Sequence, residues 1–151
     1  MGYVNFPYYM NENLALTITK NIKESGVLFC GNNGVNRIKD LKVTRKVFSI
    51  DNSVNHIMSS LDDGKFIWLG YFGNGLVRIS DIKSGLYTQF NYNKNDINSI
   101  SSDVVRSLFK DKKGNLWIGT TNGISILTPT EQTKTKPKFV RIVKSDQVNS
   151  L

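Results

Sequence analysis

The sequence is poor in cysteine, histidine and proline, and it has no long apolar run. The single cysteine in 151 residues, Cys30, excludes a disulfide within the chain. One cysteine fits a cytosolic protein, and it equally fits a bacterial periplasmic protein that does without disulfides. No apolar run approaches the roughly 18 residues that a membrane-spanning helix needs. Residues 1–7 lack the basic and apolar regions of a signal peptide.

The shortage of histidine and of known motifs removes the case for an enzyme. His56 is the only histidine, whereas a catalytic base or a metal site needs partner side chains. No Gly-x-Ser-x-Gly, His-Glu-x-x-His or P-loop pattern is present. Asp62 and Asp63 could hold a cation, but capping a turn suits them better. We therefore expect no catalytic residue, no metal and no cofactor in this chain.

Two further features have a functional and a structural interpretation. Cys30 could be a reactive thiol, but its apolar neighbours favour a buried strand residue. The formal net charge of +8 suggests a polyanionic partner. The basic residues are scattered, however, with their densest groups in a loop at 134–138 and in a turn at 110–113. This distribution favours solvated surface charge, and we expect no nucleic-acid partner.

What the sequence does contain is a pattern that occurs three times, at residues 26–35, 64–76 and 114–124. Each copy has a short apolar run, an aromatic residue, a glycine, and then Asn-Gly followed by an aliphatic residue. The recurring positions are Phe29, Gly31, Gly34, Trp68, Gly70, Gly75, Trp117, Gly119 and Gly123. From Phe29 to Trp68 is 39 residues and from Trp68 to Trp117 is 49, which is the size of a propeller blade.

The apolar runs are short and alternating, so they predict strands rather than helices. The first copy predicts strands at 14–20, 27–31, 35–39 and 45–50, the second at 54–61, 66–71, 76–81 and 86–92, and the third at 104–110, 116–120, 124–127 and 138–143. The predicted fold is all-β, a partial propeller of three four-stranded antiparallel blades. We expect an outer strand of a preceding blade at 1–10, blades at 11–52, 53–95 and 96–144, and the start of a truncated repeat at 145–151. The chain is therefore interpreted as a fragment of a larger propeller.

Residues 111–124, Asp-Lys-Lys-Gly-Asn-Leu-Trp-Ile-Gly-Thr-Thr-Asn-Gly-Ile, resemble the two-component regulator propeller repeat. So does the segment at 98–105 with which the third copy begins, called the lead-in below. This repeat fills the periplasmic sensor region of hybrid two-component histidine kinases of Bacteroides-type bacteria. The resemblance implies a periplasmic, carbohydrate-responsive sensor segment without catalysis, whose membrane helix and histidine kinase lie outside this chain. A structural or protein-interaction module and a fragment of a propeller lyase or hydrolase remain the alternatives.

Four residues are candidates for binding a ligand. Tyr71 and Phe72 lie in an insertion that breaks the second copy, and exposed aromatics on a loop tip could stack on an oligosaccharide. The alternative is that they fold back onto the blade. Arg37 and Arg78 each follow a repeat glycine by three residues. They could surround an anionic ligand, but pairing with a carboxylate or carbonyl of a neighbouring blade is the favoured interpretation. The recurring tryptophans are expected to pack between blades.

An arc of three blades leaves two apolar faces open. We expect these faces to pack against the remaining blades of the parent chain, or to drive self-association that closes a ring.

Overall fold

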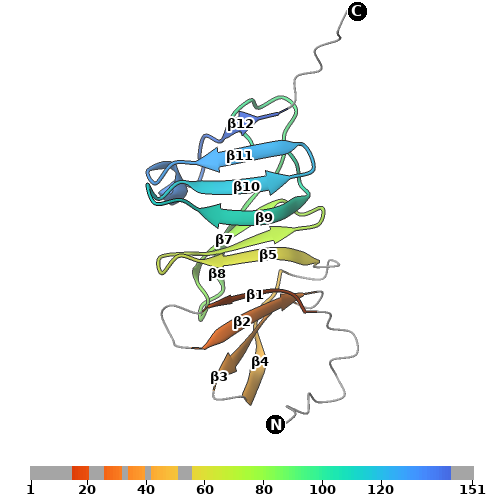
Figure 1. Cartoon of the computed structure of the whole chain (residues 1–151), viewed down its shortest axis with the longest axis vertical. Coiled ribbons are helices and arrows are strands. Elements are labelled where there is room, and N and C mark those ends of the chain that lie inside the picture. Colours follow the sequence, from red (N-terminus) through yellow and green to blue (C-terminus); the bar gives the residue numbers. More distant parts are fainter. Residues whose placement is uncertain (1–14, 21–25, 32–33, 40–41, 51–55, 144–151) are drawn as a thin grey trace, which may run out of the picture.

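The computed structural model describes residues 15–20, 26–31, 34–39, 42–50 and 56–143, which form three four-stranded sheets (Figure 1). Blade 1 consists of β1 (Ala15–Lys20), β2 (Val27–Gly31), β3 (Gly34–Lys39) and β4 (Lys42–Phe48). Blade 2 consists of β5 (Ile57–Asp62), β6 (Ile67–Tyr71), β7 (Leu76–Asp81) and β8 (Leu86–Phe90). Blade 3 consists of β9 (Val105–Lys110), β10 (Leu116–Thr120), β11 (Gly123–Leu127) and β12 (Val140–Ile142), with a short 3-10 helix, η2 (Glu131–Thr133), before β12.

In every blade the strands pair antiparallel in chain order, so the predicted fold class is confirmed. Predicted spans and observed strands agree for β2, β7 and β10, and differ most at β4, which was expected at 45–50. The three sheets fall inside the blade limits expected from the sequence, which themselves stay predictions. The expected outer strand at 1–10 and the repeat start at 145–151 lie outside the described residues.

The Asn-Gly pairs at 74–75 and 122–123 form the turns between the second and third strands of blades 2 and 3, where only glycine fits. Gly75 and Gly123 both have positive φ, at 72° and 81°. A Cβ on either would come within 2.2 Å of a carbonyl oxygen of the fourth strand, on Phe90 and Ile142 respectively. The turn can therefore lie flat against the edge of its own blade.

The blades stack face to face along the long axis of the molecule, with blade 2 between the other two (Figure 1). The first strand of each blade is innermost, since β1 lies beside β5 and β5 beside β9. Alternation along β6 directs Leu69 and Tyr71 to blade 1 and Trp68 to blade 3. One apolar cluster consequently fills each of the two seams between blades. In blade 3, Leu116 and Ile118 face blade 2, on the side opposite Trp117.

The register of blade 1 corrects the alignment of the first copy. Cys30 pairs with Val35 in the way that Gly70 pairs with Leu76, so Cys30 occupies the position of the repeat glycine. Leu28 then stands at the tryptophan position, and the assignment of Phe29 and Gly31 as repeat residues is wrong by one. Four residues separate Cys30 from Val35, as four separate Gly119 from Ile124. Gly31 is one of these four residues and was mistaken for the repeat glycine. A slip of one residue exchanges the two faces of a strand, and Leu28 and Cys30 accordingly pack against blade 2.

Candidate functional site

The innermost strands β5 and β9 begin at one edge of the blades, which we call the lead-in edge. It comprises His56, residues 72–74, residues 101–104, Arg106 and residues 121–122. The turn after β6 is fastened here, because the Phe72 N–H donates to the carbonyl oxygen of His56 (2.9 Å). The N–H groups of Gly73 and Gly75 both donate to the carbonyl oxygen of Asp103 (3.0 and 2.8 Å). The turn of blade 2 is thus bound to the lead-in of blade 3.

The polar residues of the lead-in hold this edge in place. The Asp103 carboxylate accepts the Tyr92 N–H (2.7 Å), while the Ser101 N–H donates to the Ser125 hydroxyl (2.9 Å). The Ser101 hydroxyl is hydrogen-bonded to Thr120 (2.9 Å). Hydroxyl and carboxylate side chains are needed because the lead-in has no strand partner for much of its length. The result is a rigid support for the side chains exposed beside it.

Of the two aromatic candidates, only Phe72 is exposed at this edge, with 51% of its surface accessible. Tyr71 is the last residue of β6 and is fully buried, which corresponds to the alternative in which the aromatics fold back rather than to an exposed ring on a loop tip. Neighbouring residues on a strand point to opposite faces, which separates the two rings. Burial, with smaller contributions from Cys30 and Tyr87, raises the pKa of the Tyr71 hydroxyl.

Arg78 is hydrogen-bonded to blade 3. Its Nη1 donates to the carbonyl oxygens of Gln132 (2.5 Å) and Lys134 (2.9 Å), and the side chain lies between the rings of Phe66 and Phe90. Only 4% of Arg78 is accessible, and burial lowers the pKa of its guanidinium. These contacts correspond to pairing with a neighbouring blade, the second of the two interpretations. Their carbonyl partners belong to the loop between β11 and β12.

Arg37 occupies the position of Arg78 in the first blade, where it stands opposite Leu28 as Arg78 stands opposite Trp68. The Arg37 side chain is half-buried in β3. Neither recurring arginine therefore lies on the lead-in edge beside Phe72.

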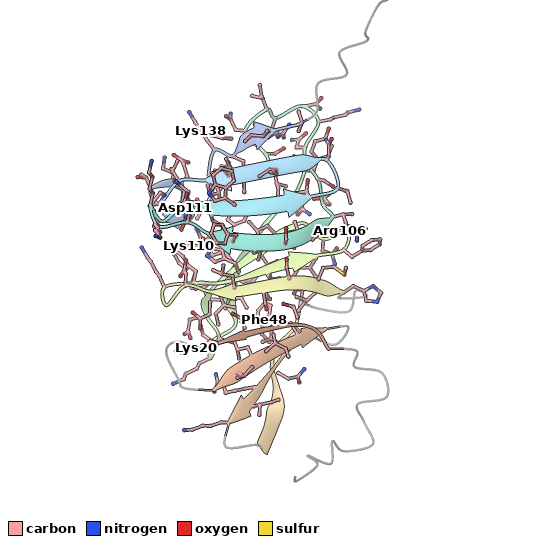
Figure 2. The ribbon with its side chains drawn as sticks, in the orientation of Figure 1. Lys20, Phe48, Arg106, Lys110, Asp111 and Lys138 are labelled. Atoms are coloured by element: carbon pink, nitrogen blue, oxygen red, sulfur yellow. The ribbon has the colours of Figure 1, made fainter. Side chains whose placement is uncertain are left out.

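An arginine that the sequence pattern did not single out does lie there. Each innermost strand has an irregularity at the same place, and the skipped residues are Leu16, Met58 and Arg106. Such a bulge redirects a side chain, and Arg106 is exposed near the start of β9 (Figure 2). Within the described residues it makes no hydrogen bond or ion pair. Arg106 follows Val104, the bridge partner of Phe72, by two residues.

The opposite edge carries acidic turns. The Asp63 carboxylate accepts the N–H groups of Lys65 (2.9 Å) and Phe66 (2.7 Å), the indole N–H of Trp68 (3.1 Å) and the Lys110 ammonium (2.5 Å). Burial alone would raise the pKa of Asp63, but these bonds hold it below its usual value. The turn-capping role expected for Asp62 and Asp63 is confirmed, since Asp62 caps the Gly64 N–H (2.8 Å).

The equivalent acid of blade 3 is Asp111. It accepts the N–H groups of Lys113 and Asn115 and the indole N–H of Trp117, each at 2.9 Å. The Trp117 and Asn115 side chains, which donate to this carboxylate, lower its pKa to about 2. Lys110 and Asp111 lie at the end of β9 away from Arg106 (Figure 2). Asp63 thus accepts the lysine of the next blade where Asp111 accepts the side-chain amide of Asn115 (2.9 Å).

The other candidates are structural in the described part of the chain. Cys30 is fully buried, and burial raises the pKa of its thiol to about 12 despite a hydrogen bond with Ser60. No cluster of three metal-ligating side chains occurs among the described residues. The same residues include no helix with the length and apolarity to cross a bilayer.

Comparison with known proteins identifies similarity to one family of repeats. A family model described as the two-component regulator propeller matches residues 98–122, from the lead-in to the turn after β10. Histidine kinase P4 from Formosa agariphila is 30% identical over 66 residues, which make up 44% of this chain and 5% of that protein. The chain therefore spans a small part of the length of this relative.

Two solved structures share the arrangement of blades. The extracellular domain of a protein assigned to the hybrid two-component systems of B. thetaiotaomicron is 20% identical, with a TM-score of 0.69 over 89% of this chain and 19% of that one. Virginiamycin B lyase from Staphylococcus aureus is 18% identical, with a TM-score of 0.59 over 84% of this chain and 40% of the lyase. At these identities the likeness shows the propeller fold alone.

Proposed function

We propose that this chain, a propeller segment carrying a two-component regulator propeller repeat at residues 98–122, is a ligand-sensing piece of the extracytoplasmic domain of a hybrid two-component sensor. The segment performs no catalysis, responds to carbohydrate, and acts in the periplasm. The family match at the third blade is the observation that carries this proposal. The similarity to a histidine kinase and to an extracellular two-component domain supports it.

The lead-in edge is the proposed binding site. Phe72 offers a flat apolar ring that can stack on the C–H face of a sugar, and Arg106 offers a planar set of donors for carboxylate or hydroxyl oxygens. Both side chains are exposed. The Phe72 N–H is hydrogen-bonded to His56, and the residues on either side of Arg106 are paired with β10. Loops on a rigid scaffold are the usual place for such sites.

A ligand on Phe72 would act on the seam between two blades. The turn that carries Phe72 is bound to Asp103, and Asp103 belongs to the lead-in of the next blade. Binding energy at this edge therefore changes how blade 2 and blade 3 pack, without any chemical step. A signal of this kind needs only a different affinity of the ligand for two packing arrangements.

Thermal unfolding with acidic and neutral oligosaccharides tests the proposal. We expect a saturable rise in Tm with at least one sugar, which Phe72→Ala and Arg106→Met abolish. Phe109→Ala and Lys112→Met are matched controls, because they remove an exposed ring and an exposed cation away from the lead-in edge. A rise that persists in Phe72→Ala and Arg106→Met refutes the site. No rise with any sugar would instead favour a protein-interaction module.

A further inference from the structure

Two Asn-Gly pairs lie entirely within the described residues, Asn74-Gly75 in blade 2 and Asn122-Gly123 in blade 3. Asparagine is a chemically labile residue, and it is most labile before glycine. The glycine has no Cβ that would block the approach of its own nitrogen to the side-chain carbonyl of the asparagine. Because the reaction also needs water and a peptide that is free to move, the fold decides which of the two pairs reacts.

The peptide that joins Asn74 to Gly75 is held at both of its polar atoms. The Gly75 N–H donates to the Asp103 carbonyl oxygen (2.8 Å), and the Asn74 carbonyl oxygen accepts the side-chain amide of Gln89 (2.9 Å). Gly75 itself is buried. The nitrogen that would have to attack is therefore bound to another group and shielded from water.

The pair in blade 3 lies at the surface. Thr121, Asn122 and Gly123 are all exposed. The Asn122 side-chain amide donates to the Ser101 carbonyl oxygen over 3.2 Å, near the long end of the range for such a bond. A neutral hydrogen bond at an exposed position is easily exchanged for water. The amide can consequently turn to where the Gly123 nitrogen reaches its carbonyl carbon.

We propose that Asn122 is a site of spontaneous modification, at which the turn of blade 3 loses its side-chain amide while the matching turn of blade 2 is protected. The Gly123 nitrogen gives its proton to water and bonds to the Asn122 Cγ, whereupon the Cγ–Nδ2 bond breaks and Nδ2 leaves as ammonia. Water then opens the succinimide ring at either carbonyl and leaves aspartate or isoaspartate. The net reaction converts an amide and water into a carboxylate and ammonium, so it needs no oxidant.

The modified turn loses its contact with the lead-in. A carboxylate has no hydrogen to donate, so the Ser101 carbonyl oxygen loses its bond with position 122 and faces a negative charge instead. The isoaspartate product also lengthens the backbone of the turn between β10 and β11 by a carbon atom. This inference does not depend on whether the lead-in edge binds a sugar.

Incubation of the whole chain at pH 8, followed by peptide mapping with mass spectrometry, tests the site. We expect Asn122 to be converted several times faster than Asn74 in the folded chain. In guanidinium chloride the two should react at similar rates, because Asn-Gly-Leu and Asn-Gly-Ile differ little once the fold is lost.

Three results would overturn the proposal. The first is conversion of Asn74 as fast as that of Asn122 in the folded chain. The second is a difference that persists in denaturant, since it would come from the local sequence rather than from the fold. The third is an Asn122 that stays intact in the folded chain over a period in which the unfolded chain reacts.

Substitution tests the loss of the lead-in contact. Asn122→Asp should lower the Tm at pH 7, and the difference from the parent should shrink below about pH 4, where the new carboxyl is protonated and can donate again. Asn122→Ala is the control, because it removes the donor without adding a charge and its effect should not change with pH. An Asn122→Asp chain as stable as its parent at pH 7, or a loss that is the same in acid, overturns this consequence.

Discussion

Replacing Arg78 with methionine removes a cation that joins blade 2 to blade 3 by donating to backbone carbonyls. The guanidinium donates to Gln132 and Lys134 of blade 3 and to Thr88 of its own blade (3.1 Å). Methionine has a similar length and can fill the space between Phe66 and Phe90. The substitution therefore tests the polar contacts rather than the packing.

The expected loss of unfolding free energy follows from these contacts. A hydrogen bond from a charged donor contributes about 1.5–3 kcal/mol, and two such bonds reach across the seam. Stacking on two rings adds about 1 kcal/mol. Removing a buried charge recovers part of this sum, because the desolvation of the guanidinium no longer opposes folding. We expect a net loss of about 2–4 kcal/mol, which lowers the Tm by about 5–15 °C for a chain of this size.

Urea unfolding followed by tryptophan fluorescence measures this loss, since Trp68 lies in the same seam. Arg106→Met is the matched control, because Arg106 is exposed and has no polar partner within the described residues. We expect Arg106→Met to change the unfolding free energy by less than about 0.5 kcal/mol. Equal effects of the two substitutions would refute the argument that Arg78 joins the blades.

Three further predictions concern the seams. Gly70→Ala should destabilise the chain by about 2–4 kcal/mol in urea unfolding, because a Cβ would lie 2.4 Å from a valine of β9. Gly119→Ala, at the same repeat position, should lower the unfolding free energy less, because its closest contact is a serine hydroxyl of its own blade. A double-mutant cycle of Asp63→Asn and Lys110→Met should give a coupling of about 0.5–2 kcal/mol. Because the folded pKa of Asp63 is lowered, its stabilisation is present above about pH 4 and is lost as the pH falls through the folded pKa, so the Asn variant and its parent should converge in acid. Native Cys30 should react with iodoacetamide at pH 8 at least about 100-fold more slowly than in denaturant, since burial raises its pKa to about 12; equal rates would contradict a buried thiol.

The architecture was predictable from the sequence because its signals are local and repeated. Asn-Gly turns and alternating apolar residues gave three four-stranded blades. The first copy was misaligned because Gly31 resembles the repeat glycine, whereas strand pairing gives that position to Cys30. Gly31 and Cys30 are distinguished only by the hydrogen-bond register between strands, which the sequence of one strand does not show.

The candidate site was less predictable, because exposure depends on contacts between blades. Tyr71 ends the predicted strand at 66–71, but its burial depends on the packing of blade 1 against blade 2, which the sequence of one strand does not show. Arg106 is exposed at a bulge whose position is visible only when β9 is matched with β10. Arginine recurs at the repeat position of Arg78, which made this residue a candidate for binding. Its carbonyl partners, however, lie more than fifty residues further along the chain. Long-range partners of this kind leave no local pattern.

The hydrogen bonds that Asp103 accepts across a seam bear on how such repeats can be gained or lost. Its carbonyl oxygen fastens the turn of blade 2, and its carboxylate fastens the segment that leaves β8, although Asp103 precedes blade 3 in the chain. The unit that can be duplicated or deleted without leaving loose ends is therefore a blade together with the lead-in before it. Recombination between Asp103 and β9 would separate Asp103 from the blade that it precedes, so the products would contain a turn without the Asp103 carbonyl that accepts its N–H groups. Tolerated insertions should instead fall in turns such as that at Gly85, where a Cβ would meet no atom within 4 Å.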